Sequence, residues 1–207
     1  MAERAVPQPY RGYNVLEKWS SPSFDAVTRT VVARRLQRTP PRRFFAADEF
    51  RTLEAACARL LATEPAEPPI ASWIDADLFE GRGEGFRHDD MARADVVWRN
   101  GLAGIDAESR RRFGAAFADL GGDAQDATLR AVQAGDVDGA GFDGVPARRF
   151  FVQVLLKAAV GHFYGSPQGW NEIGFGGPAS PRGYVRLRLD RRDPWEAPFR
   201  SDRPTSR

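Results

Sequence analysis

An all-α fold is predicted by three features of the sequence. Apolar residues recur at helical spacing in several stretches, which are separated by proline and glycine. A hydrophobic content of 42% over 207 residues is enough for one sizeable core. Strand-like alternation is confined to a short stretch after Tyr184. We therefore expect a single-domain bundle of about six or seven helices, with an extended N-terminal arm and an irregular C-terminal segment rich in glycine, proline and aromatic residues.

The first residues contain prolines and aromatic side chains without periodicity, so residues 1–20 are expected to form an arm. A first helix should follow over residues 21–38, because Ser21-Pro22 supplies a cap and a first-turn proline. Its expected inward residues are Phe24, Val27, Val31 and Leu36. The helical domain is expected to span residues 21–190, and residues 191–207 should form a polar tail.

The remaining helices are expected between glycine- and proline-rich turns. A second helix, at about residues 47–62, has acidic residues in its first turn and one apolar stripe. Further helices are expected at about residues 70–80, 89–102, 106–120 and 123–133. Phe113, Phe117 and Leu120 should point inward from the third of these, and Leu129 and Val132 from the fourth. The last begins at Pro146, and its apolar residues cover more than one face. We therefore expect it to lie at the centre of the bundle.

Charge and cysteine content exclude several classes of protein. Thirty Lys and Arg against 28 Asp and Glu leave a net charge of only +2, so we expect no nucleic-acid partner. The single cysteine, Cys57, rules out an internal disulfide. No apolar run approaches the roughly 18–20 residues needed to cross a bilayer. No signal peptide is seen at the N-terminus, so we expect a cytoplasmic chain.

The sequence contains no convincing catalytic or metal-binding motif. His88 and His162 are far apart, no cysteine cluster accompanies them, and neither a G-x-S-x-G motif nor a phosphate-binding loop occurs. We assign no catalytic and no metal-binding residue. One alternative stays open: His162, near the end of the last helix, with Glu172 as an acid partner, would give a small-molecule pocket or a simple enzyme.

Aromatic residues and glycines alternate after the last helix, in residues 163–184. Glycine is costly to order, whereas the aromatic side chains favour burial. Such a segment either packs on its own protein or binds a partner, and the sequence leaves both possibilities open.

Four motifs of the chain resemble the gluconate 2-dehydrogenase subunit 3 family. FYGSP at residues 163–167 and IGFGGP at residues 173–178 are similar to its C-terminal signature. FFAADEFRTLEA at residues 44–55 resembles its opening helix, and IDADL at residues 74–78 resembles the segment that follows.

The resemblance implies a small, all-helical, non-catalytic subunit that stabilises or helps to mature a flavin-dependent dehydrogenase. The partner would be a flavoprotein of the glucose-methanol-choline type, which oxidises an alcohol, sugar or sugar acid. FAD is then expected in the partner and no cofactor in this chain. The expected docking residues are Tyr164, Pro167, Trp170, Phe175, Pro178 and Tyr184. Relatives often carry a twin-arginine export signal, so a periplasmic location is expected only if the chain is exported together with its partner.

Overall fold

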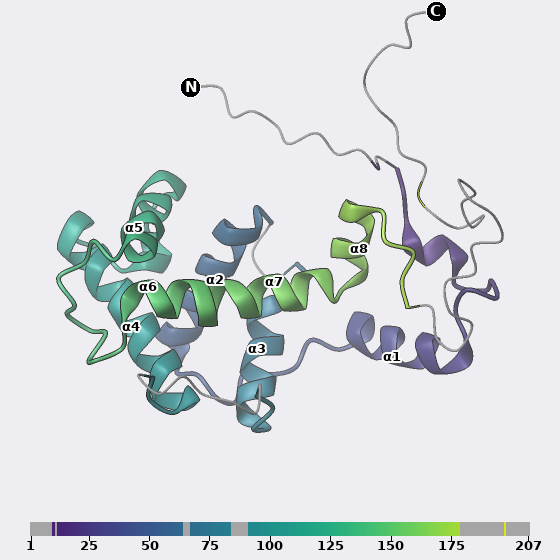
Figure 1. The fold of residues 1–207 in the computed structure, drawn as a ribbon, viewed down its shortest axis with the longest axis horizontal. Coiled ribbons are helices and arrows are strands. Elements are labelled where there is room, and N and C mark those ends of the chain that lie inside the picture. The colour runs from purple at the N-terminus through teal and green to yellow at the C-terminus, as the bar shows by residue number, and fades with distance from the viewer. Residues whose placement is uncertain (1–9, 11, 64–66, 84–90, 179–196, 198–207) are drawn as a thin grey trace, which may run out of the picture. The chain divides into compact units, whose positions relative to one another are not determined.

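The computed structural model describes residues 10, 12–63, 67–83, 91–178 and 197 (Figure 1). These residues form helices joined by turns, so the predicted all-α class is confirmed. They fall into two compact units. Residues 39–163 form the larger unit, and residues up to 38 together with those from 164 onward form the smaller one. The predicted domain boundary at residue 190 lies outside the described residues.

One long helix organises the larger unit. It consists of α6 (Ala147–Arg149), a π-helical segment (Phe150–Leu156) and α7 (Lys157–Tyr164), and Figure 1 shows it as one continuous green helix. The side chains of Phe150, Leu155 and Ala159 are completely buried. They share one core with the other helices of the unit, so the predicted central position of this helix is confirmed.

Two of those helices, α2 and α3, match the sequence prediction closely. α2 (Ala47–Leu61) buries Leu53, Ala56 and Cys57, which belong to the predicted apolar stripe. The Glu49 carboxylate accepts a hydrogen bond from the Ala46 N–H at 2.7 Å and so stabilises the start of this helix. α3 (Ile70–Phe79) follows and is apolar on most sides. The predicted boundaries are confirmed because both helices have clear start and stop signals.

Between residues 94 and 113, one helix replaces the two that the sequence predicted. α4 (Ala94–Phe113) runs through Gly101 and Gly104 without a break. These glycines are needed for packing, because a β-carbon at Gly101 would lie 2.3 Å from the Phe150 ring and one at Gly104 would lie 2.4 Å from the Phe142 ring. Phe113, predicted to point inward, is 43% exposed, since the helix ends at Gly114.

Two further helical segments complete the larger unit. A short 3₁₀-helix, Phe117–Asp119, follows α4, and Phe117 is completely buried. α5 (Gly122–Ala134) buries Leu129 and Val132, as predicted, and ends at Gly135 in the left-handed conformation. Both buried residues belong to the common core with the long helix.

The smaller unit joins the two ends of the chain. It contains a 3₁₀-helix (Val15–Lys18), α1 (Ala26–Gln37) and α8 (Pro167–Ile173). Part of the predicted arm is thus helical. The core of this unit is a cluster of Val15, Phe24, Val32 and Trp170. Residues 1–9 and 11 of the predicted arm lie outside the described residues.

α1 differs from its prediction in both its start and its buried face. It begins after Asp25, whose carboxylate accepts a hydrogen bond from the Thr28 N–H at 2.6 Å. Its buried residues are Thr28 and Val32, whereas three predicted inward residues are exposed, namely Val27, Val31 and Leu36. Apolar residues occur on more than one side of this short helix, so their spacing alone did not identify the buried side.

Candidate functional site

The C-terminal segment, predicted to be irregular, contains the helix α8. Ser166 caps it by accepting a hydrogen bond from the Gly169 N–H at 3.3 Å, and Pro167 occupies the first helical position. Gly174 ends the helix with a φ of +66°. The sequence prediction was wrong here because the helix has only seven residues, too few to show a periodic apolar pattern.

Trp170 holds α8 against the rest of the smaller unit. Its side chain is only 5% exposed and belongs to the apolar cluster with Val15 and Phe24. Its indole N–H donates to the Tyr164 carbonyl at 2.8 Å, and the Phe175 ring meets the indole edge-on at 6.0 Å. The indole is therefore satisfied within the chain, both by packing and by hydrogen bonding.

The N-terminal segment packs against the glycine-rich signature. The Val15 N–H donates to the Asn171 side-chain oxygen at 2.7 Å. A β-carbon at Gly174 would lie 2.7 Å from the Tyr10 ring, and one at Gly177 would lie 2.9 Å from the Phe24 ring. Both glycines also have positive φ angles. They are therefore required for the close approach of the N-terminal segment to the glycine-rich residues 174–177.

The predicted docking residues differ in how much surface they present. Pro167 and Trp170 are buried, Phe175 and Pro178 are half-buried, and Tyr164 is 38% exposed. Tyr184 lies outside the described residues. Much of the predicted surface thus packs on its own chain, and its docking role stays a prediction.

His162 has a different acid partner from the one the sequence suggested. Its Nε2 lies 3.4 Å from the Asp77 carboxylate, whereas Glu172 accepts a hydrogen bond from the Tyr164 hydroxyl at 3.5 Å. Burial and the neighbouring Glu172 raise the pKa of Tyr164, so this phenol stays protonated. Asp77 was missed because it lies far from His162 in the sequence.

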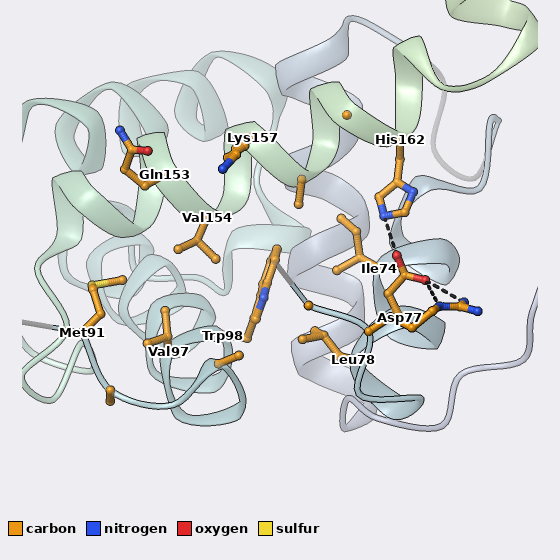
Figure 2. A pocket seen from close by; sticks show the side chains of 16 residues that line it. Ile74, Asp77, Leu78, Met91, Val97, Trp98, Gln153, Val154, Lys157 and His162 are labelled. Carbon is orange, nitrogen blue, oxygen red and sulfur yellow. Dashed lines mark hydrogen bonds and ion pairs between the residues drawn. The ribbon is translucent and has the colours of Figure 1, made fainter. Parts of the chain in front are cut away.

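His162 and Asp77 both line a cavity of about 620 Å³ in the larger unit (Figure 2). Such a volume lies within the roughly 300–1,000 Å³ of typical small-molecule sites. Most of the lining is apolar, and Figure 2 shows the Trp98 indole among these side chains. The apolar side chains come from α3, α4 and the long helix, and they include Ile74, Leu78, Val97, Trp98, Val154 and Ala158.

A charged network forms part of the lining of this cavity. One oxygen of Asp77 accepts from two nitrogens of Arg82, at 2.9 and 2.7 Å, and its other oxygen faces His162. Arg82 also pairs with Glu80 at 2.6 Å. The hydrogen bond to Asp77 raises the pKa of Arg82, so the guanidinium stays charged. Asp77 is therefore already engaged by two partners.

The cavity wall includes the π-helical segment. Phe151, Leu155, Ala159 and Phe163 follow each other at every fourth residue, and all are buried. In an α-helix of 3.6 residues per turn, residues spaced four apart drift steadily around the helix axis. A π-helical turn is wider, so it keeps residues with this spacing closer to one face. Gln153, Val154 and Lys157 from the same stretch of the helix line the cavity. π-Helical turns are rare and occur often at functional sites.

The IDADL motif places two aspartates in different environments. Asp77 lines the cavity, whereas Asp75 is completely buried and accepts hydrogen bonds from consecutive backbone N–H groups. The Arg43 and Phe45 N–H groups donate to this carboxylate at 2.6 and 2.9 Å. The Phe44 N–H donates to both carboxylate oxygens, at 3.0 and 3.2 Å. Asp75 thus fixes the chain that enters α2 to helix α3. The sequence signal for this role is an acid on an otherwise apolar helix.

The described residues contain neither a cluster of metal-ligating side chains nor a membrane-spanning helix. No group of three or more His, Cys, Asp or Glu side chains in this part of the chain is arranged to hold a metal ion. Within the same residues, no helix combines the length and apolar character needed to cross a membrane.

Comparisons with known proteins identify the family. The sequence profile described as gluconate 2-dehydrogenase subunit 3 matches residues 47–177, which is more than half of the chain. The match begins at α2 and ends in the glycine-rich signature, so it includes the cavity. Searches of curated proteins and of solved structures gave no match. The chain therefore belongs to the gluconate 2-dehydrogenase subunit 3 family.

Proposed function

We propose that this chain is a non-catalytic accessory subunit of a flavin-dependent dehydrogenase. The family match over residues 47–177 is the observation that carries the proposal. The partner is a flavoprotein of the glucose-methanol-choline type, which binds FAD and oxidises an alcohol, sugar or sugar acid. This chain binds the partner and stabilises it or assists its maturation.

The docking surface that we propose centres on Tyr164 and continues over Phe175 and Pro178. Tyr164 is 38% exposed and the other two are half-buried, so part of each residue reaches the surface. Pro167 and Trp170 support this surface, since both are buried and Trp170 packs in the apolar cluster of the smaller unit. Aromatic residues on a rigid support are typical of binding hot spots.

Co-expression tests the proposal directly. The full chain carries an affinity tag and is produced together with the flavoprotein encoded beside it. We expect a yellow complex with a flavin absorbance spectrum to elute from the affinity column and to remain intact in size-exclusion chromatography. Recovery of the tagged chain alone, from cells that contain soluble flavoprotein, would contradict the proposal.

A pair of exposed aromatic residues supplies the matched control. Tyr164→Ala removes a ring that is 38% exposed on the proposed surface, and it should reduce co-purification about tenfold or more. Phe113→Ala removes a ring that is 43% exposed in the other unit, and it should leave co-purification unchanged. Equal effects of the two substitutions would place the docking surface elsewhere.

A further inference from the structure

The cavity of the larger unit combines apolar walls with a small number of polar side chains. Its volume of about 620 Å³ is sufficient for a small organic molecule. The apolar side chains of Ile74, Val97 and Val154 suit a hydrocarbon or aromatic body. The polar groups decide which head group such a molecule carries.

Trp98 contributes a hydrogen-bond donor without an acceptor. Its side chain is 5% exposed, and its rings pack edge-on against Phe45 and Phe150 at 6.0 and 5.8 Å. Among the residues that the structure describes, none accepts a hydrogen bond from its Nε1, and this atom is not fully covered by protein. A buried indole N–H normally finds a partner. Since Trp98 lines the cavity, a ligand in the cavity can supply that acceptor.

The other polar groups of the cavity also favour a ligand that accepts hydrogen bonds. The only lining carboxylate, among the described residues, is Asp77, and both of its oxygens are engaged by Arg82 and His162. Arg82 is likewise engaged, by Asp77 and Glu80, and the Gln153 amide can both donate and accept. The Trp98 indole and the Lys157 ammonium group can only donate. A carboxylate matches such a donor-rich lining better than a neutral or cationic head group does.

We propose that this cavity binds an amphiphilic organic anion, with its apolar body between α3, α4 and the long helix and its carboxylate oxygen accepting from the Trp98 N–H. This site is distinct from the proposed docking surface, which belongs to the other unit. The inference does not depend on the proposed function, because its test uses the full chain without any partner protein.

The binding test uses decanoate as the probe. Isothermal titration of the purified full chain should show saturable binding of one decanoate, and decanoate should displace the fluorescent anion anilinonaphthalene sulfonate. Decanol, which has the same body and no charge, should bind at least about tenfold more weakly. The absence of saturable decanoate binding would overturn the proposal. Equal affinity for decanol would show that the site does not require an anionic head group and would overturn that part of the proposal.

Three substitutions locate the bound molecule. Gly161 lines the cavity, and a β-carbon there would meet no atom within 4 Å, so Gly161→Leu should fill the space and abolish binding. Trp98→Phe keeps an aromatic ring but removes the donor, and it should weaken decanoate binding about tenfold. Lys157→Gln should weaken it about threefold, as expected for a partly solvated charge.

Matched controls separate binding from folding. Arg148 lies on the same long helix, is exposed and does not line the cavity, so Arg148→Gln should bind decanoate as the unmodified chain does. Each variant is first shown to unfold cooperatively by circular dichroism. Unchanged decanoate affinity in folded Gly161→Leu, or in folded Trp98→Phe if the leucine variant does not fold, would show that the anion binds elsewhere and overturn the proposal.

Discussion

The two faces of the long helix, residues 147–164, differ sharply in how they are packed. One face is completely buried, and there the Phe150 ring lies so close to Gly101 that no β-carbon fits between them. Other residues of the helix line a cavity, and a β-carbon at Gly161 would meet open space. One continuous helix thus provides both a rigid core and a wall that leaves room for another molecule. We infer that stability is set by the first face and ligand binding by the second.

The largest expected effect comes from removing the main side chain of the packed face. Phe150→Ala leaves a hole against α4 and should lower the free energy of unfolding by about 3–5 kcal/mol. Val152→Ala is the control, because Val152 lies two residues further along and is 36% exposed, and it should cost less than about 1 kcal/mol. Urea unfolding measures both. Similar losses in the two variants would remove the distinction between the faces.

Two aspartates of helix α3 allow a similar comparison, between a buried side chain and one that lines the cavity. Asp75→Asn weakens a buried network of backbone hydrogen bonds and should cost about 2–3 kcal/mol. Asp77→Asn affects a side chain that is 34% exposed and should cost about 1 kcal/mol or less. Thermal and urea unfolding of both variants test this order. A larger loss for Asp77→Asn would mean that the cavity end contributes more to the core than its exposure indicates.

The smallest effects come from one substitution made at two helical glycines. Gly101→Ala forces a β-carbon into the Phe150 ring and should destabilise the chain by about 1–3 kcal/mol. Gly161→Ala replaces a helical glycine beside open space and should stabilise the chain by about 0.5–1 kcal/mol. The critical result is that the two substitutions change the stability in opposite directions. The urea midpoints of the two variants measure these changes. A loss of stability in Gly161→Ala would show that the cavity wall is tightly packed after all.

The sequence predicted those features that depend on neighbouring residues. The apolar stripe of α2 is confirmed because it extends over several turns. The central helix after Pro146 is confirmed for the same reason, although its π-helical turn was not predicted. The every-fourth-residue spacing from Phe151 to Phe163 is a signal that could have revealed this turn.

Features that depend on distant residues were predicted less well. Gly104 falls between the two helices that the sequence predicted, and only the fold shows the Phe142 ring that it accommodates. The residues that line the cavity are spread along the sequence between Ile74 and His162, so no local sequence pattern predicts it. The acid partner of His162 was misassigned for the same reason. Short helices such as α8 were missed because caps, rather than periodicity, define them.

The hydrogen bond between Val15 and Asn171 also constrains when the smaller unit can form during synthesis. These residues are 156 positions apart, and the entire larger unit lies between them in the sequence. At about 5–20 residues per second, the ribosome needs on the order of ten seconds to add Asn171 after Val15. Throughout this interval Val15 and Phe24 lack the Trp170 side chain that completes their cluster. The larger unit can therefore fold first, whereas Val15 and Phe24 reach their final environment only after Trp170 has been added.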